Sequence, residues 1–99
     1  MRYLFLLNPT AGKRDCTAEL APAIRAAAQR AGIPPEKRKV VVTQYAGHAR
    51  ELAAEAAHTA QADGEPVRIW TAGGDGTFNE ALTGAQGCSL AAVGCLPFG

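Results

Sequence analysis

Residues 67–80, with the sequence VRIWTAGGDGTFNE, join an apolar run to a glycine-rich turn that opens a helix. The apolar part, Val67–Ala72, has the near-continuous hydrophobicity of a strand covered on both faces, as in a parallel sheet. Three other runs share this character: Tyr3–Leu7, Val40–Val42 and Leu90–Val93. The sequence therefore predicts four strands, and the glycine-rich turn follows the third of them.

Two alanine-rich segments lie between these strands. Residues 20–31 and 48–62 are expected to be helices, because alanine has the highest helix propensity. Gly32 is expected to cap the first helix. Pro22 requires that helix to begin near residues 20–21, since proline in a helix interior costs about 3 kcal/mol. The predicted apolar faces consist of Leu20, Ile24, Ala27 and Ala31 in the first helix and Ala49, Leu52, Ala53, Ala56 and Ala60 in the second.

The regular alternation of strands and helices predicts an α/β domain with a parallel sheet flanked by helices. A length of 99 residues allows one small domain. The net charge of +1 argues against a nucleic-acid-binding protein, and no apolar run is long enough to span a membrane. Three cysteines without C-x-x-C spacing indicate reduced thiols and a cytoplasmic protein.

The glycine-rich turn carries the strongest chemical signal. Gly73, Gly74 and Gly76 allow the backbone to approach a bulky anion, and the first amides of the following helix have no partners within the helix. A phosphate suits such a position. Asp75 would repel a phosphate unless it holds a cation, and Mg²⁺ fits that requirement. The alternative is a structural turn, capped by Asp75 or Thr77.

Two further loops follow the first and second predicted strands. Asn8-Pro9-Thr10-Ala11-Gly12-Lys13 is a tightly shaped turn, and Thr43 begins the segment that leads through Gly47 to His48. The carboxyl ends of parallel strands share one edge of a sheet, which is where α/β proteins bind ligands. We therefore expect the three loops to meet at one rim. His48 is expected to be a surface or capping side chain, and Trp70 to pack in the core or on the sheet.

These motifs resemble, in order, those of the diacylglycerol kinase catalytic domain family, in particular its bacterial lipid kinases. The matching segments are Asn8–Gly12, Thr43 with Gly47-His48-Ala49, Gly73–Glu80 with the later Gly84, and Leu96–Gly99 as the beginning of a further motif. The resemblance implies a Rossmann-like or phosphofructokinase-like three-layer nucleotide-binding domain, here truncated. A β-rich lipid-binding domain, which this chain does not reach, would complete the enzyme.

The resemblance also implies the chemistry: transfer of the γ-phosphoryl group of ATP to the hydroxyl of diacylglycerol or a related lipid. Asp75 would be the catalytic and Mg²⁺-associated residue. The ATP-binding residues would be Asn8, Pro9, Thr10, Ala11, Gly12, Thr43, Gly74, Asp75, Gly76, Thr77, Phe78, Asn79 and Glu80. Contact with the membrane would be peripheral and made through the further domain, and the 99 residues alone are expected to be inactive.

Two alternatives remain at this point. The signature loop recurs in looser form in NAD kinases and phosphofructokinases, so the acceptor could be a soluble nucleotide or sugar phosphate. The chain could also be a nucleotide-binding module without catalytic activity.

Overall fold

The computed structural model describes residues 1–9, 17–72 and 74–95, and they form a four-stranded parallel sheet. The strands are β1 (Arg2–Leu7), β2 (Arg38–Val42), β3 (Val67–Ala72) and β4 (Ala91–Cys95), and their order across the sheet is β2-β1-β3-β4. The helices are α1 (Thr17–Arg30), α2 (His48–Asp63) and α3 (Gly74–Ala85), with a short 3-10 helix, η1 (Pro35–Lys37), before β2. All four predicted strands are present.

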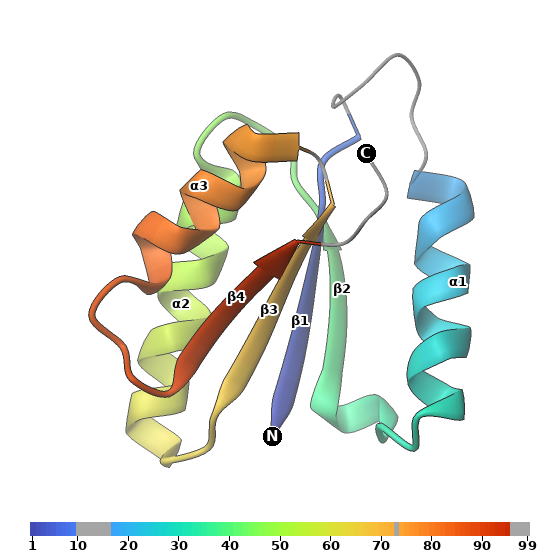
Figure 1. Ribbon diagram of the computed structural model, residues 1–99, viewed down its shortest axis with the longest axis horizontal. Coiled ribbons are helices and arrows are strands. Elements are labelled where there is room, and N and C mark those ends of the chain that lie inside the picture. The colour runs from blue at the N-terminus through green and yellow to red at the C-terminus, as the bar shows by residue number, and fades with distance from the viewer. Residues whose placement is uncertain (10–16, 73, 96–99) are drawn as a thin grey trace.

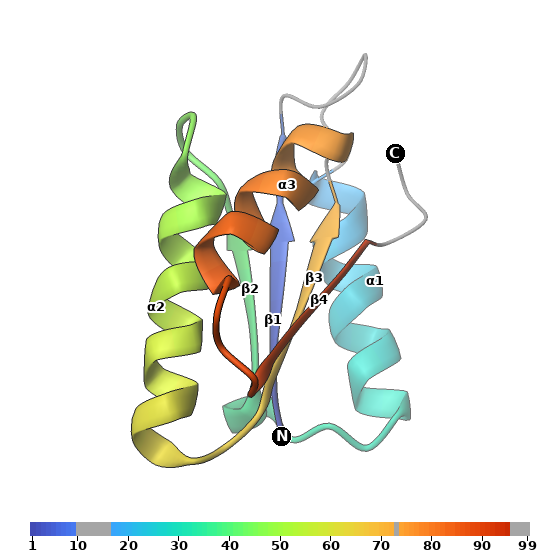
Figure 2. The same cartoon turned by 60° about the vertical axis from the view of Figure 1, so that its left-hand side comes forward.

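The sheet separates two hydrophobic clusters, so the domain has three layers (Figures 1 and 2). On one face, Leu4, Leu6 and Ile69 pack beneath α2 and α3. On the other face, Phe5 and Leu7 pack against α1. Successive residues of a strand point to opposite faces, and this explains why both sets of side chains in β1 are apolar. The predicted three-layer α/β class is confirmed.

Helix α1 differs from its prediction in two respects. It begins at Thr17, so Pro22 lies inside the helix rather than at its start. Pro22 is exposed and close to the amino end, where its missing N–H removes one early helical hydrogen bond. The predicted apolar face is also wrong in part, because Ala27 and Ala31 are exposed. The described residues of α1 that pack toward the sheet include Ala21, Ile24 and Ala28, three or four positions apart, and the side chain of Leu20 is not described.

The edge strands extend further than predicted. Strand β2 includes Arg38 and Lys39, which tolerate a strand position because β2 is at the edge of the sheet; Arg38 donates to the carbonyl of Ile33 at 2.7 Å. Strand β4 continues through Gly94, where a Cβ would stand 2.5 Å from the ring of Trp70. Trp70 thus packs on the sheet, as expected.

Glycines end two of the helices in the left-handed conformation. Gly32 (φ 80°) follows α1 and Gly64 (φ 71°) follows α2, where its N–H donates to the carbonyl of Ala60 at 2.8 Å. The predicted cap at Gly32 is confirmed. Cys88 is a free thiol among the described residues, and Cys16 lies outside them.

Candidate functional site

The carboxyl ends of β1, β2 and β3 meet at one edge of the sheet. The N–H of Asn8 donates to the carbonyl of Ala72 at the end of β3, at 2.9 Å. The N–H of Thr43, just after β2, donates to the carbonyl of Leu7 at the end of β1, at 2.8 Å. These bonds extend the strand ladder by one residue on each side of β1. The expected convergence is confirmed for the starts of the three loops, at Asn8, Thr43 and Ala72, whereas residues 10–13 and Gly73 lie outside the described residues.

Side chains also join this edge to helix α3. The amide nitrogen Nδ2 of Asn8 donates to Oγ1 of Thr77 at 3.1 Å. The hydroxyl of Thr43, which is buried, donates to the carbonyl of Leu7 at 3.3 Å. Thr77 is also buried, with 3% of its surface exposed. Asn8 and Thr77 therefore hold the amino end of α3 against the end of β1, which fixes where the helix amides point.

The glycine-rich segment is more helical than the sequence suggests. Helix α3 begins at Gly74, so Asp75, Gly76 and Thr77 form its first turn instead of a loop before it. Gly76 does not adopt a positive φ. The segment is therefore not a turn capped by Asp75 or Thr77. The first amides of α3 have no partners within the helix, and the helix dipole makes this end favourable for an anion.

Gly84 and Gly76 differ in why glycine occupies the position. A Cβ on Gly84 would stand 2.2 Å from the carbonyl oxygen of Arg50, so Gly84 is required by the close packing of α2 against α3. A Cβ on Gly76 would meet none of the described residues within 4 Å. Neither backbone conformation nor packing requires glycine at 76, although glycine there weakens a helix. An open position of this kind leaves room for a ligand next to the backbone.

The other predicted site residues of α3 point in several directions. Asp75 is exposed on the first turn, and Phe78 and Glu80 are partly buried. Asn79 is exposed and lines a hollow between α3 and β4 together with Leu82 and Val93. Pro9 directly follows Asn8. Thr10, Ala11, Gly12 and Gly73 lie outside the described residues.

The described residues offer few ligands for a metal ion. In residues 1–9, 17–72 and 74–95 no three His, Cys, Asp or Glu side chains gather in a group that could hold one. Mg²⁺ keeps several waters and is commonly bound by one or two carboxylates together with substrate phosphates. The single exposed carboxylate of Asp75 fits an ion of that type, but not a metal held entirely by protein.

The sequence analysis missed an aromatic pair on the loop between β2 and α2. Tyr45 stacks on His48, with ring centroids 4.5 Å apart and 16° between the planes. The hydroxyl of Tyr45 donates to the Glu51 carboxylate, and this hydrogen bond raises the pKa of Tyr45 above 10. The available signal was a tyrosine three residues before a histidine at a helix start.

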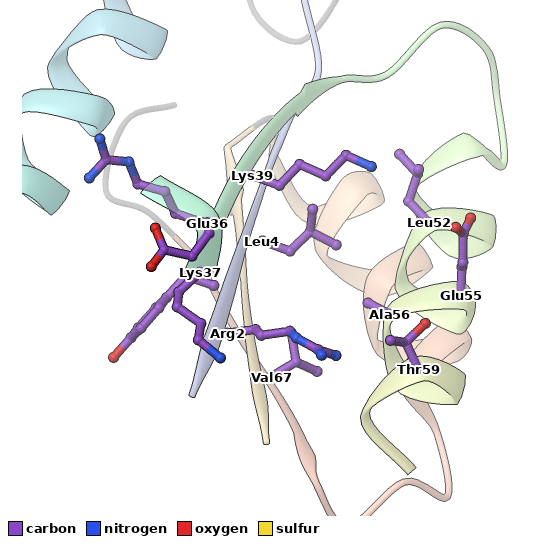
Figure 3. A pocket seen from close by; sticks show the side chains of 12 residues that line it. Arg2, Leu4, Glu36, Lys37, Lys39, Leu52, Glu55, Ala56, Thr59 and Val67 are labelled. Atoms are coloured by element: carbon purple, nitrogen blue, oxygen red, sulfur yellow. The ribbon is translucent and has the colours of Figure 1, made fainter. Parts of the chain in front are cut away.

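A second hollow lies at the opposite end of the sheet (Figure 3). It has a volume of about 260 Å³ between β1, β2 and α2, with an apolar floor that includes Leu4 and Leu52. Arg2 and Lys39 point toward it from the strands. Strands begin here, whereas ligands of open α/β sheets bind where strands end.

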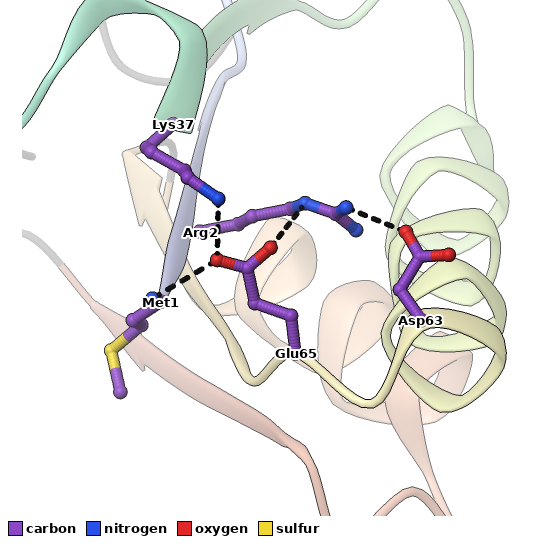
Figure 4. A network of polar contacts seen from close by, with 5 residues as sticks. All are labelled: Met1, Arg2, Lys37, Asp63 and Glu65. Atoms are coloured by element: carbon purple, nitrogen blue, oxygen red, sulfur yellow. Dashed lines mark hydrogen bonds and ion pairs between the residues drawn. The ribbon is translucent and has the colours of Figure 1, made fainter.

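Ion pairs connect the charged groups at this end of the sheet (Figure 4). Glu65 accepts from Lys37 at 2.8 Å and from the amino group of Met1 at 3.1 Å, and Arg2 contacts both Glu65 and Asp63. Hydrogen bonds from Lys37 and the amino terminus lower the pKa of Glu65 from 4.5 to about 2. We interpret this network as a clamp between β1, η1 and the turn before β3.

The fold and the rim together define a class of protein: a parallel α/β domain in which a glycine-rich helix start follows a central strand at the carboxyl edge. Within this class, the chain belongs to the diacylglycerol kinase catalytic domain family, whose model matches residues 2–99. This match confirms the family expected from the sequence, which is a family of kinase catalytic domains. No curated protein matches the chain. Within the described part of the chain, no helix has both the length and the apolar character needed to cross a membrane.

Proposed function

We propose that this chain binds ATP with Mg²⁺ at the carboxyl edge of its sheet, as part of an enzyme that phosphorylates a lipid hydroxyl. The observation that carries the proposal is the position of Gly76, which no other described residue approaches, on a helix end that Asn8 and Thr77 hold at the rim. Membership of the diacylglycerol kinase catalytic domain family supports the reaction and the class of acceptor.

Some residues of the rim would bind the nucleotide, and others would position the binding groups. The amides of the first residues of α3, Gly74 to Gly76, would donate to the phosphates. Asn8 would keep those amides in place through Thr77. Thr43 would bound the same rim on the β2 side, with residues 9–12, Phe78, Asn79 and Glu80 completing the predicted nucleotide-binding set. Asp75 would hold the hydrated Mg²⁺, which neutralises phosphate charge when it is bound.

Such positioning suits phosphoryl transfer. The reaction needs aligned phosphates and neutralised charge more than covalent participation of the protein. A fixed helix end offers its amides without reorganisation, which is how a preorganised site stabilises developing charge. We assign the attacking hydroxyl to a lipid on the basis of the family. The general base would belong to another part of the enzyme.

Two measurements test the proposal. Isothermal titration calorimetry of the chain with ATP and Mg²⁺ should show binding, which Asp75→Asn weakens in the presence of Mg²⁺. A radiolabel assay of the encoded protein at its natural length should transfer phosphate from ATP to diacylglycerol in vesicles. Transfer to NAD or fructose 6-phosphate instead would assign a soluble acceptor, and binding without transfer to any acceptor would leave a nucleotide-binding module.

A further inference from the structure

The loop between β2 and α2 presents a tyrosine ring to solvent at the candidate nucleotide rim. Tyr45 is 56% exposed and lies two residues after Thr43, whose N–H and hydroxyl both bond to the end of β1. The stacked His48 covers one face of the Tyr45 ring. Because more than half of the residue remains exposed, the ring retains an open surface.

Several contacts fix this ring although it is not buried. Its hydroxyl is held by Glu51, one turn into α2. The His48 ring beneath it is held in turn, because Nδ1 accepts from the N–H of Gln44 at 2.9 Å. The N–H of His48 donates to the carbonyl of Tyr45 at 3.1 Å. The loop, both rings and the start of α2 are therefore connected by hydrogen bonds and stacking. These contacts already restrict rotation of the Tyr45 side chain, so ligand binding would lose little further side-chain entropy.

We propose that Tyr45, supported by His48, is a stacking platform for the purine base of the bound nucleotide. The inference rests on the proposed function and extends it from the phosphates to the base. Strand β2 is two places from β3 in the sheet, a lateral separation of about 10 Å at ~4.8 Å per strand. A triphosphate at the start of α3 can thus extend across β1 and place its base by the β2 loop.

The chemistry of the platform favours a base over any other part of the ligand. An exposed aromatic face attracts another flat π-system, and base–aromatic stacking is tolerant of the identity of the base. The hydroxyl of Tyr45 is engaged with Glu51, so the residue contributes its ring face rather than a hydrogen bond. Neighbouring Glu51 is anionic, which disfavours phosphate at this position and keeps the triphosphate at α3.

The test compares ATP with inorganic tripolyphosphate, which has the phosphates without the base. With Mg²⁺ present, Tyr45→Ala should weaken ATP binding roughly 5- to 150-fold in calorimetry, the range found for loss of one base–aromatic stack. Tripolyphosphate affinity should stay unchanged. Tyr45→Phe keeps the ring and should stay within about threefold of the wild type. Leu82→Ala, an exposed apolar residue on α3, is the matched control and should change neither affinity.

Each contrary result has a distinct meaning. An equal loss of affinity for ATP and for tripolyphosphate in Tyr45→Ala would overturn the platform. The stacked pair would then serve only to stabilise the loop. Unchanged ATP affinity in that variant would overturn the platform as well. Equal affinity of the wild type for ATP and tripolyphosphate would refute the platform alone, because the phosphate site would remain. Binding of neither ligand by the wild type would refute the proposed function itself and the platform with it.

Discussion

Replacing Gly76 with alanine tests whether glycine at this position serves the stability of the fold or the binding of a ligand. Gly76 is the third residue of α3 and has no positive φ, and no described residue lies within 4 Å of where its Cβ would stand. Folding therefore loses nothing when the methyl group is added. Alanine is instead favoured over glycine in a helix by up to about 1 kcal/mol.

The expected outcome is a variant that is more stable and binds less well. For a domain of this length, 1 kcal/mol shifts Tm by roughly 4–8 °C, so Gly76→Ala should unfold a few degrees above the wild type in a circular dichroism melt. The same methyl group would stand in the space assigned to a phosphate. Affinity for ATP with Mg²⁺, measured by calorimetry, should fall at least about tenfold, which corresponds to ~1.4 kcal/mol.

Gly84→Ala is the control, because glycine at 84 is required by packing between helices. Its Cβ would lie 2.2 Å from the carbonyl oxygen of Arg50 and 3.0 Å from the backbone nitrogen of Ala54, so α2 and α3 would have to move apart. We expect this variant to lose stability by about 1–3 kcal/mol. The reasoning is refuted if Gly76→Ala binds ATP as tightly as the wild type, whatever its Tm.

Three further predictions follow from the ionic and hydrogen-bonded groups. Asp75→Asn should abolish phosphoryl transfer by the encoded protein, because a neutral amide holds Mg²⁺ poorly, yet leave Tm within about 2 °C since Asp75 is exposed; normal turnover would contradict the assigned role. Asn8→Ala removes the hydrogen bond to Thr77 and should cost about 1 kcal/mol in urea unfolding while also weakening ATP binding; loss of stability with full ATP affinity would make the contact purely structural. The pKa of Glu65 is lower in the folded chain, about 2, than its ordinary 4.5, so its stabilisation is complete above pH 4.5 and is lost as the pH falls toward 2. Glu65→Gln should therefore unfold below the wild type at pH 7 and converge with it near pH 2, and a constant difference in Tm across that range would contradict the ion-pair network.

The order of elements and the location of the rim could be predicted from sequence because they depend on local patterns. Continuous apolar runs such as Val67–Ala72 indicate buried parallel strands, and alanine-rich segments such as 48–62 indicate helices. Once all strands are parallel, their carboxyl ends must share one edge. Asn8 and Thr43 were therefore expected at the same edge as the end of β3, and their bonds to the ends of β3 and β1 place them at that edge.

Contacts between distant residues decided the rest. The order β2-β1-β3-β4 depends on pairing between strands, which no local pattern encodes. Gly76 and Gly84 look alike in the sequence, and only the position of Arg50 on the neighbouring helix shows that one serves packing and the other leaves space. Tyr45 likewise became a candidate only when the fold set its ring on His48 and its hydroxyl on Glu51. Periodicity and propensity act along the chain, whereas close approach is a property of segments brought together by the hydrophobic core, and so it belongs to the tertiary structure.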